Sequence, residues 1–223
     1  MRPRTLLATA KVPDGGELHC YQHDRDYFIF SGNVELMSTR VFGSEEALAE
    51  LAIERRGADR TGRVLVGGLG MGFTLARVLA LVGKDTQVDV VELIPEVVQW
   101  HRDWFGEFSG HPLQDPRTTL IVDDVAKVLA ERPDTYDVIL LDVDNGPEAL
   151  LRPSNQGIYS QRGLHRARDA LRRSGVLAIW SSGEHPTFPG RLEHRGFEVT
   201  QRFVRARRDK GARRVIWVAR RVG

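Results

Sequence analysis

The sequence has a single cysteine, Cys20, among its 223 residues. One thiol forms neither an internal disulfide nor a cysteine-based metal cage, and this scarcity is typical of a reducing compartment. The sequence also lacks any apolar run near the roughly 18 residues that span a membrane. The apolar stretch before Lys11 is shorter than the core of a secretory signal. We therefore expect a cytoplasmic protein that does not contact a membrane.

Neither positive nor negative charge is in excess, because the chain has 32 basic and 30 acidic residues and a net charge of +2. A field this weak argues against a nucleic-acid partner. Basic residues do gather near the C-terminus: Arg202, Arg205, Arg207, Arg208, Lys210, Arg213 and Arg214. Such a cluster can bind phosphate groups, but arginines on an edge strand also prevent edge-to-edge aggregation. We favour the second interpretation.

The histidines lack the close spacing along the chain that is typical of metal ligands. They are scattered along the chain: His19, His23, His101, His111, His165, His185 and His194. Because structural metal sites need closely spaced nitrogen or sulfur ligands, the sequence predicts no metal site.

Three glycines, Gly68, Gly70 and Gly72, alternate where the apolar run RVLVG gives way to the amphipathic stretch FTLARVLALVG. Glu92 ends the next apolar run, VDVVE. A strand, a glycine-rich turn, a helix and a second strand ending in an acid form the unit with which doubly wound α/β proteins bind a nucleoside. Backbone without Cβ atoms lets a ligand approach closely. The plainer alternative is a turn that only joins a strand to a helix.

The spacing of the glycines in this turn limits which ligands it can bind. Phe73 stands where the dinucleotide fingerprint has its third glycine, the glycine that lets the helix pack close to the strand beneath a pyrophosphate. A pyrophosphate is therefore disfavoured. A carboxylate about 20 residues further on accepts hydrogen bonds from ribose hydroxyls, and Glu92 fits that position. Together these features favour S-adenosylmethionine or a relative.

Strands and helices alternate from Arg63 onward, which predicts a mostly parallel sheet with helices on both faces. The expected strands are 63–67, 87–92, 118–122, 136–142 and 175–181, and the expected helices are near 72–83, 95–105, 124–131 and 160–173. The last two runs, FEVTQRFVRA and RRVIWVARR, predict an antiparallel hairpin at the sheet edge. Such an ending resembles the class I methyltransferase fold, which is Rossmann-like.

The first part of the chain has a different pattern. Residues 18–38 hold two or three short β-rich runs, which predict antiparallel hairpin strands. Ser44 is a candidate N-cap for a helix that ends at Gly57. We therefore divide the chain into a small N-terminal β element, residues 1–43, and a Rossmann-like cofactor-binding domain, residues 44–223.

Acids follow two further strands. The apolar strand in YDVILLDVDNGPEAL delivers Asp142 to its carboxyl end, and Asp144 follows in the loop. The ligand crevice of an open parallel sheet lies beyond the carboxyl ends of its strands, so both should face the same crevice as Gly70 and Glu92. Asp123, after TTLIV, is placed to accept a hydrogen bond from an adenine amino group. The neighbouring Asp124 is a candidate helix cap, and the loop after Asp142 has a plainer explanation as a turn.

These segments resemble the spermidine synthase family of aminopropyltransferases. The likeness covers nearly the whole chain: the N-terminal β element, RVLVGGLGMG, VELIPEVV, VDD before a helix, YDVILLD with its acidic loop, and YSQRGLHRARDALRRSGVLAIWSS. Family members transfer the aminopropyl group of decarboxylated S-adenosylmethionine to a diamine. The resemblance therefore implies a small-molecule amine acceptor and, by analogy with a family that commonly dimerises, a homodimer.

By position, the resemblance implies ribose binding by Glu92, adenine binding by Asp123 and amine deprotonation by Asp142. It also implies a substrate-lining role for Tyr159, for which a buried aromatic is the plainer alternative. A carboxylate within hydrogen-bond reach can hold the substrate cation and take its proton. Because a sulfonium is already an activated leaving group, aligning the reactants supplies much of the acceleration and no metal is needed.

The chain departs from the family pattern at several positions. Met71 stands where the family's turn carries an aspartate that recognises the aminopropyl ammonium, and the family's Asp-x-x-Asp-Pro loop is one residue longer here. Glu35, Ser44 and Glu45 replace the family's glutamine and tyrosine-histidine pair. Glu35 is a candidate contact for a cationic substrate, with a solvated hairpin glutamate as the alternative.

Three functions follow from these patterns. The leading one is a transferase that moves an aminopropyl or related group from decarboxylated S-adenosylmethionine, or S-adenosylmethionine, to an amine and releases methylthioadenosine. The second is an S-adenosylmethionine methyltransferase on the same fold, which Met71 makes credible. The third is a cofactor-binding protein without catalysis.

Overall fold

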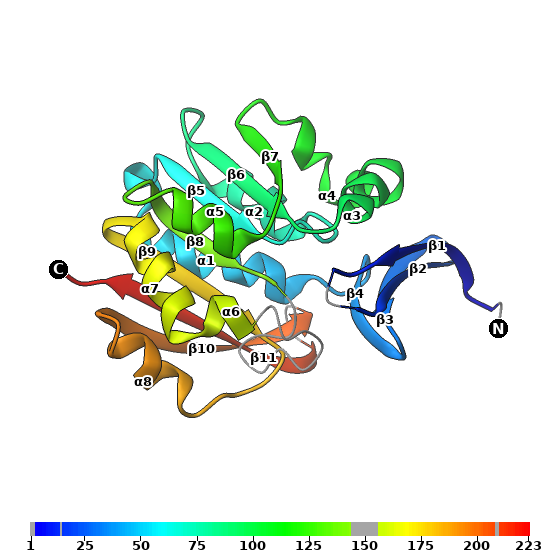
Figure 1. Cartoon of the computed structure of the whole chain (residues 1–223). Coiled ribbons are helices and arrows are strands. Elements are labelled where there is room, and N and C mark those ends of the chain that lie inside the picture. Colours follow the sequence, from blue (N-terminus) through cyan, green and yellow to red (C-terminus); the bar gives the residue numbers. More distant parts are fainter. Residues whose placement is uncertain (1–2, 14, 144–155, 208–209) are drawn as a thin grey trace.

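The computed structural model describes residues 3–13, 15–143, 156–207 and 210–223. They form a large α/β body with a smaller sheet beside it (Figure 1). The main sheet has the strand order β10-β11-β9-β8-β5-β6-β7. The bounds of its strands are β5 Arg63–Gly67, β6 Gln87–Glu92, β7 Thr118–Val122, β8 Tyr136–Leu141, β9 Leu171–Ser181, β10 Phe197–Arg207 and β11 Lys210–Arg221.

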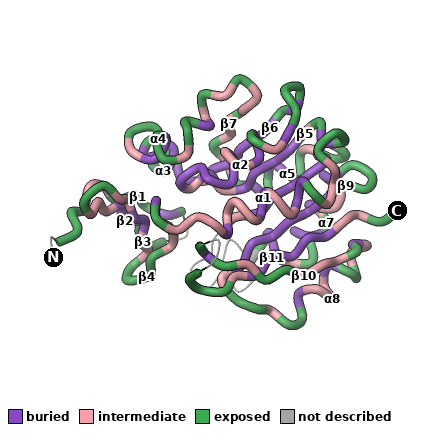
Figure 2. Tube along the Cα trace, turned by 180° about the vertical axis from the view of Figure 1, so that it is seen from behind, coloured by how far each residue is buried: buried purple, intermediate pink, exposed green. Residues whose placement is uncertain are grey.

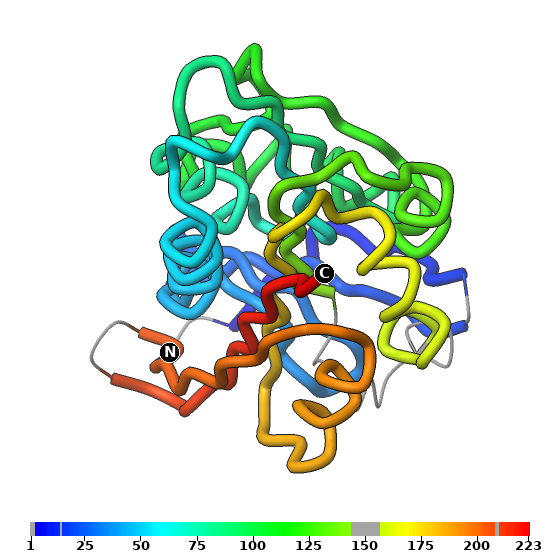
Figure 3. Tube along the Cα trace, turned by 90° about the vertical axis from the view of Figure 1, so that its left-hand side faces the viewer, coloured from blue at the N-terminus to red at the C-terminus, as the bar shows by residue number. Residues whose placement is uncertain are grey.

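Strand directions match the predicted fold class. Strands β5 to β9 run parallel, whereas β11 pairs antiparallel with β9 and with the edge strand β10. Figure 3 shows this hairpin, in orange and red, at the margin opposite the green segment that carries β7. The predicted antiparallel hairpin at the sheet edge is therefore confirmed.

Helices cover both faces of the main sheet (Figure 1). Their bounds are α1 Gly43–Arg56, η1 Ala58–Arg60, α2 Phe73–Leu81, α3 Pro95–Trp100, η2 His101–Phe105, α4 Gly106–Ser109, η3 Pro112–Gln114, α5 Val125–Glu131, α6 Gln156–Tyr159, α7 Gln161–Ala170 and α8 Phe188–Glu193. Val64 and Val66 of β5 pack with α1 and α2, whereas Leu65 packs with α5 and α7 on the other face. This alternation buries a continuous apolar strand on both sides, and Figure 2 shows the burial concentrated along the central strands.

The N-terminal β element is an antiparallel sheet with the order β1-β2-β3-β4. Its strands are β1 Thr5–Lys11, β2 Glu17–His23, β3 Asp26–Ser31 and β4 Val34–Ser38. Strand β1 was not predicted, because TLLATAK holds few of the β-branched and aromatic residues that mark strands. Leu18 and Ile29 of this sheet pack with Met71, Ile94 and Val97. The small sheet thereby lies against the carboxyl end of the parallel strands.

The predicted N-cap of α1 is wrong. The helix begins at Gly43, with Phe42 at the N-cap position and without a side-chain cap. Ser44 lies inside the first turn, where its hydroxyl donates to Oε2 of Glu45 at 2.7 Å. A neighbouring carboxylate has therefore taken the hydroxyl that we expected to cap the helix.

Tertiary pairing also moves two predicted boundaries. Strand β9 begins at Leu171, inside the segment expected to be helical to residue 173, because Leu171 pairs with Tyr136 of β8. The helix expected over 95–105 is α-helical only to Trp100 and continues as a π-helix through Phe105. Single-turn π segments of this kind are frequent beside functional sites.

Candidate active site

The glycine-rich turn between β5 and α2 separates two hollows at the carboxyl end of the parallel strands. The first holds about 700 Å³ of empty space and the second about 630 Å³. Both volumes include space that is open to solvent. The residues that line both hollows are Leu36, Met37, Gly68, Gly70 and Asp142. The turn, the end of β8 and β4 of the small sheet therefore share one wall between the two hollows.

Two backbone positions in this turn require glycine. Gly68 has φ +94°, and a Cβ atom there would lie 2.5 Å from the main-chain oxygen of Asp142. Gly72 has φ +86°, and a Cβ atom there would lie 2.5 Å from Nε2 of His101. An L residue is strained at such φ values. The two glycines therefore allow the turn to lie directly against β8 and the π-helical segment.

Glu92 lies at the end of β6 in the wall of the first hollow, with 8% of its surface exposed. Its Oε2 accepts hydrogen bonds from the main-chain N–H of Leu69 at 3.0 Å and of Gly70 at 3.4 Å, and its Oε1 accepts from that of Ile94 at 3.0 Å. Burial raises the pKa of this carboxyl, whereas the N–H donors lower it. Each carboxylate oxygen can accept more than one hydrogen bond. Glu92 therefore braces the turn and keeps acceptor capacity for a ligand.

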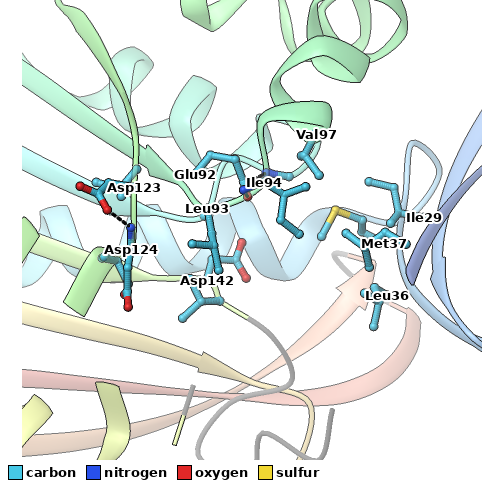
Figure 4. A pocket seen from close by; sticks show the side chains of 16 residues that line it. Ile29, Leu36, Met37, Glu92, Leu93, Ile94, Val97, Asp123, Asp124 and Asp142 are labelled. Carbon is cyan, nitrogen blue, oxygen red and sulfur yellow. Dashed lines mark hydrogen bonds between the residues drawn. The ribbon is translucent and has the colours of Figure 1, made fainter. Parts of the chain in front are cut away.

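Two acids lie at the end of the first hollow opposite Met37 (Figure 4). Asp123 accepts from Nζ of Lys127 at 2.7 Å and from the N–H of Asp124 at 2.8 Å, and Lys127 lowers the pKa of Asp123. Asp124 accepts from the N–H of Ala126 at 2.7 Å. The predicted helix-capping role of Asp124 is therefore confirmed, and Asp123 is ionised at neutral pH.

Asp142 follows β8 and lines the second hollow together with Glu45 of α1. The Thr74 hydroxyl donates to Oδ2 of Asp142 at 2.9 Å, and Oγ1 of Thr74 also lies 3.5 Å from the main-chain oxygen of Glu45. Ser44 supplies a hydroxyl donor to Glu45. Each carboxyl thus has one neutral hydroxyl donor, and the two carboxyls belong to segments far apart in the sequence.

The pKa values of these two carboxyls are raised. Burial raises the pKa of Asp142 to about 6. Burial, and then the charge of Asp142, raise the pKa of Glu45 to about 7, against smaller lowering effects that include Ser44 and Arg214. Two like charges in one cavity oppose full ionisation of both groups. At neutral pH the pair therefore carries less than two full negative charges.

Apolar and aromatic side chains, among them Met71, Phe73 and Trp180, form much of the remaining wall of the second hollow. Phe73 stacks on Phe42 with ring centroids 4.1 Å apart. The buried indole N–H of Trp180 and the buried hydroxyl of Ser38 have no hydrogen-bond partner among the described residues. Buried polar groups are normally paired, so these two atoms have unused capacity beside the second hollow.

Two predicted residues, Tyr159 and Glu35, are not found in these walls. Tyr159 is 1% exposed, and its hydroxyl donates to the main-chain oxygen of Val143 at 3.1 Å, the geometry of the buried-aromatic alternative. Glu35 is on β4, with its side chain 39% exposed and 3.8 Å from Arg4. Neither residue lines either hollow. Asp144 lies outside the described residues.

Sequence reasoning did not place Glu45, Thr74 or Trp180 in the site. Glu45 stands where the family resemblance predicts a residue of the tyrosine-histidine pair, and this departure was a signal for it. Thr74 and Trp180 gave no comparable signal. Thr74 reaches the hollow through its hydrogen bond to Asp142, and Trp180 reaches it because β9 pairs with β8.

The chain matches the family model of the spermine/spermidine synthase domain over residues 41–190. The chain belongs to this family. It is similar to polyamine aminopropyltransferase 2 of Pseudomonas aeruginosa, with 34% identity over 125 residues, which are 54% of this chain and 34% of that protein. It is also similar to the polyamine aminopropyltransferase of Aeropyrum pernix, with 30% identity over 154 residues, which are 67% of this chain and 46% of that protein. The matches thus span about a third to a half of these curated relatives.

Spermidine synthase structures share the fold of this family member. One, in complex with the transition state analogue AdoDATO, has a TM-score of 0.80 at 16% identity. This match covers 97% of this chain and 74% of that chain. The spermidine synthase of Thermotoga maritima has a TM-score of 0.75 at 16% identity, and the match covers 97% of this chain and 73% of that chain. The fold class predicted from the sequence is therefore confirmed.

The described residues lack two further features, a membrane-spanning helix and a cluster of metal ligands. No helix among those residues has the length and apolar character needed to cross a membrane. In the same part of the chain, no three or more His, Cys, Asp or Glu side chains gather as metal ligands would.

Proposed function

We propose that this spermidine synthase family member transfers an aminopropyl group from decarboxylated S-adenosylmethionine to a small-molecule amine and releases methylthioadenosine. Family membership supports the reaction type. Two hollows that share one wall support a site for two substrates, with the sulfonium donor in the first and the amine in the second.

The charge of the residues that line the two hollows supports decarboxylated S-adenosylmethionine as the donor. The acids in their linings are Glu45, Glu92, Asp123, Asp124 and Asp142. In the described part of the chain, no lysine, arginine or histidine lines either hollow. The decarboxylated donor presents a sulfonium and an ammonium, which such walls attract, whereas S-adenosylmethionine adds a carboxylate that they repel. The acidic lining therefore favours the decarboxylated donor, even though Met71 replaces the family's aspartate.

The adenosine part of the donor fits the first hollow. We assign the ribose hydroxyls to Glu92, whose oxygens accept further hydrogen bonds, and the adenine amino group to Asp123 at the far end. Ile94 and Val97 supply apolar contacts between these acids. With the nucleoside in this orientation, the sulfonium faces the wall that contains Asp142.

Asp142 lines both hollows, so it can reach an amine in the second while the donor occupies the first. The substrate ammonium gives one proton to the Asp142 carboxylate. The freed nitrogen lone pair forms a bond to the methylene carbon beside the sulfonium, and the carbon–sulfur bond breaks with its electron pair on sulfur. The products are a secondary ammonium and the neutral thioether methylthioadenosine, and one proton remains to be released.

Product analysis tests the proposal. The protein is incubated with decarboxylated S-adenosylmethionine and a panel of mono-, di- and triamines, and products are identified by mass spectrometry. We expect methylthioadenosine and an aminopropylated amine in equal amounts, with no S-adenosylhomocysteine when S-adenosylmethionine is supplied instead. S-adenosylhomocysteine formation would indicate a methyltransferase. Calorimetric binding of the donor without any product from the panel would contradict the proposed transfer.

The predicted homodimer is part of this proposal. Sedimentation of the purified chain at micromolar concentration tests it, and a monomer would overturn it.

A further inference from the structure

Glu45 is held in the second hollow by the first turn of α1. It is the third residue of that helix, its Oε2 accepts from the Ser44 hydroxyl, and its main-chain oxygen lies 3.5 Å from the Thr74 hydroxyl that binds Asp142. The helix packs against β8, β9, β10, β11 and α2. These contacts fix Glu45 beside the end of β8, where the acceptor amine binds in the proposed function.

The charged groups that act on Glu45 are Asp142, which follows β8, and Arg214 of β11. Arg214 does not line the hollow. Its guanidinium lies 5.6 Å from the ring centroid of Trp180, and its Nη1 lies 3.5 Å from the main-chain oxygen of Ser182. Within the hollow, the charge that Glu45 meets is therefore the like charge of Asp142.

Two carboxyls in one hollow without a lining cation destabilise the fold unless they share a proton or bind a cationic ligand. A glutamine at residue 45 would avoid this cost and keep a similar size. Like-charge carboxyl pairs in a cleft are typical of sites where a proton is moved. The arrangement of Glu45 therefore points to a role in the reaction.

Resting on the proposed function, we infer that Glu45 is a positioning residue of the transfer reaction, which shares one proton with Asp142 and releases to water the proton that Asp142 takes from the amine. This pairing leaves one negative charge in the second hollow, enough to bind one ammonium group. The acceptor is therefore an amine that presents a single ammonium at this end of the hollow.

The proton count closes over one cycle. The resting pair holds one proton, and the pair holds two after Asp142 takes a proton from the substrate ammonium. The pair is then neutral and no longer holds the nitrogen as an ammonium. Glu45, which is only partly buried, loses one proton to water and restores the resting pair. A fixed negative charge at residue 45 would instead hold the substrate as an unreactive ammonium.

Titration of the Glu45 carboxyl tests the shared proton without an activity measurement. In protein carrying ¹³C at glutamate side-chain carboxyls, we expect the Glu45 signal, assigned by its loss in Glu45→Gln, to titrate with a pKa near 7. We expect this pKa to fall by about one unit or more in Asp142→Asn, because the like charge is removed. Adding a cationic amine to the wild-type protein provides the same comparison without a variant at residue 142. Titration near the ordinary glutamate pKa in all samples would overturn the inference.

Activity against pH tests the role in transfer. Glu45→Gln should lower kcat/KM at pH 7 by about 10- to 100-fold and change the shape of the acid limb of the pH profile, while Glu45→Asp restores part of both. Glu54→Gln, on an exposed position of the same helix, is the matched control and should leave rate and profile unchanged. Donor binding in the first hollow, measured by calorimetry, should be unchanged in Glu45→Gln.

The two proposals fail in different ways. If the wild-type protein forms no methylthioadenosine, the proposed function fails, whatever the titration of Glu45 shows. If the wild-type protein is active and Glu45→Gln has the same rate and pH profile, the transfer reaction holds and the role of Glu45 is refuted.

Discussion

Two aspartates at opposite ends of β8 have opposite environments. Asp137, near the start of β8, forms ion pairs with Arg56 at 2.8 Å and Arg172 at 3.0 Å and accepts two main-chain N–H bonds. Although burial alone would raise its pKa, these partners lower it overall. Asp142, just past the end of the strand, has one neutral donor, Thr74, and burial raises its pKa to about 6.

Strand β6, which β5 separates from β8 in the sheet, repeats this contrast. Asp89 is fully buried and paired with Arg63, Arg132 and the Tyr136 hydroxyl. Glu92, at the carboxyl end of the strand, accepts only from main-chain N–H groups in the described structure. Arginines thus neutralise the buried acids toward the amino ends of the strands. Glu92 and Asp142, at the carboxyl ends, have no such cation among the described residues, and in the proposed function they are the acids that meet the ligands.

Replacing Asp142 gives the largest expected effect on this contrast. Asp142→Asn removes the group that takes the amine proton, so kcat/KM should fall by about 10²- to 10⁴-fold. Thermal stability should not fall, because the amide removes a carboxyl whose ionisation is unfavourable in the fold. Steady-state kinetics and thermal unfolding of the same preparation measure both quantities. A large loss of stability with unchanged rate per folded molecule would mean that Asp142 is a structural acid like Asp137.

Replacing Asp137 should have the converse effect. Asp137→Asn leaves Arg56 and Arg172 without their carboxylate, and removing one partner of a buried pair typically costs 3–5 kcal/mol. Because Arg172 is 45% exposed, we expect about 2–3 kcal/mol, or a fall in Tm of roughly 5–10 °C. Urea unfolding measures the loss, with the exposed Asp59→Asn as control. A variant that stays stable but loses activity would break the comparison.

The pH dependence of stability is the smallest expected effect, and it tests whether the pKa shifts of Asp142 and Asp137 have opposite signs. The folded pKa of Asp142 is raised, so its charge destabilises the fold above the unfolded pKa. This cost shrinks as pH falls below about 6 and is gone below the unfolded pKa. The folded pKa of Asp137 is lowered, so its contribution is complete above the unfolded pKa and is lost only as pH falls through the lowered value. In urea unfolding, the difference between wild type and Asp142→Asn should narrow from pH 7.5 to 4.5, while that for Asp137→Asn persists. An unchanged difference for Asp142→Asn would contradict the raised pKa.

Local pattern was sufficient for the fold class and for much of the first hollow. Strand β8 is apolar throughout, so its burial on both faces and its delivery of Asp142 to the carboxyl end follow from the rules of parallel sheets. Gly68 and Gly70, which line this hollow, were predicted because backbone without Cβ atoms lets a ligand approach closely. Glu92 was predicted from its distance along the chain to the turn.

Local pattern was insufficient where long-range packing decides. The side-chain direction of Glu35 depends on the register of β3 with β4, which shifts between Ile29 and Phe30. Ser44 has the sequence signature of an N-cap, yet its hydroxyl binds Glu45. The boundary at Leu171 was misplaced because pairing with Tyr136 overrides the helical pattern.

By itself, the sequence determined the α/β alternation, the glycine-rich turn and the acids at the ends of β6, β7 and β8, because these depend on periodicity and on allowed backbone angles. The tertiary structure alone decided which acids are neutralised. Arginines reach Asp89 and Asp137, whereas Glu45 is brought to Asp142 by the packing of α1 against the sheet. The charge state of a buried carboxyl depends on its neighbours in space and on lost hydration, and neither quantity is local in the chain.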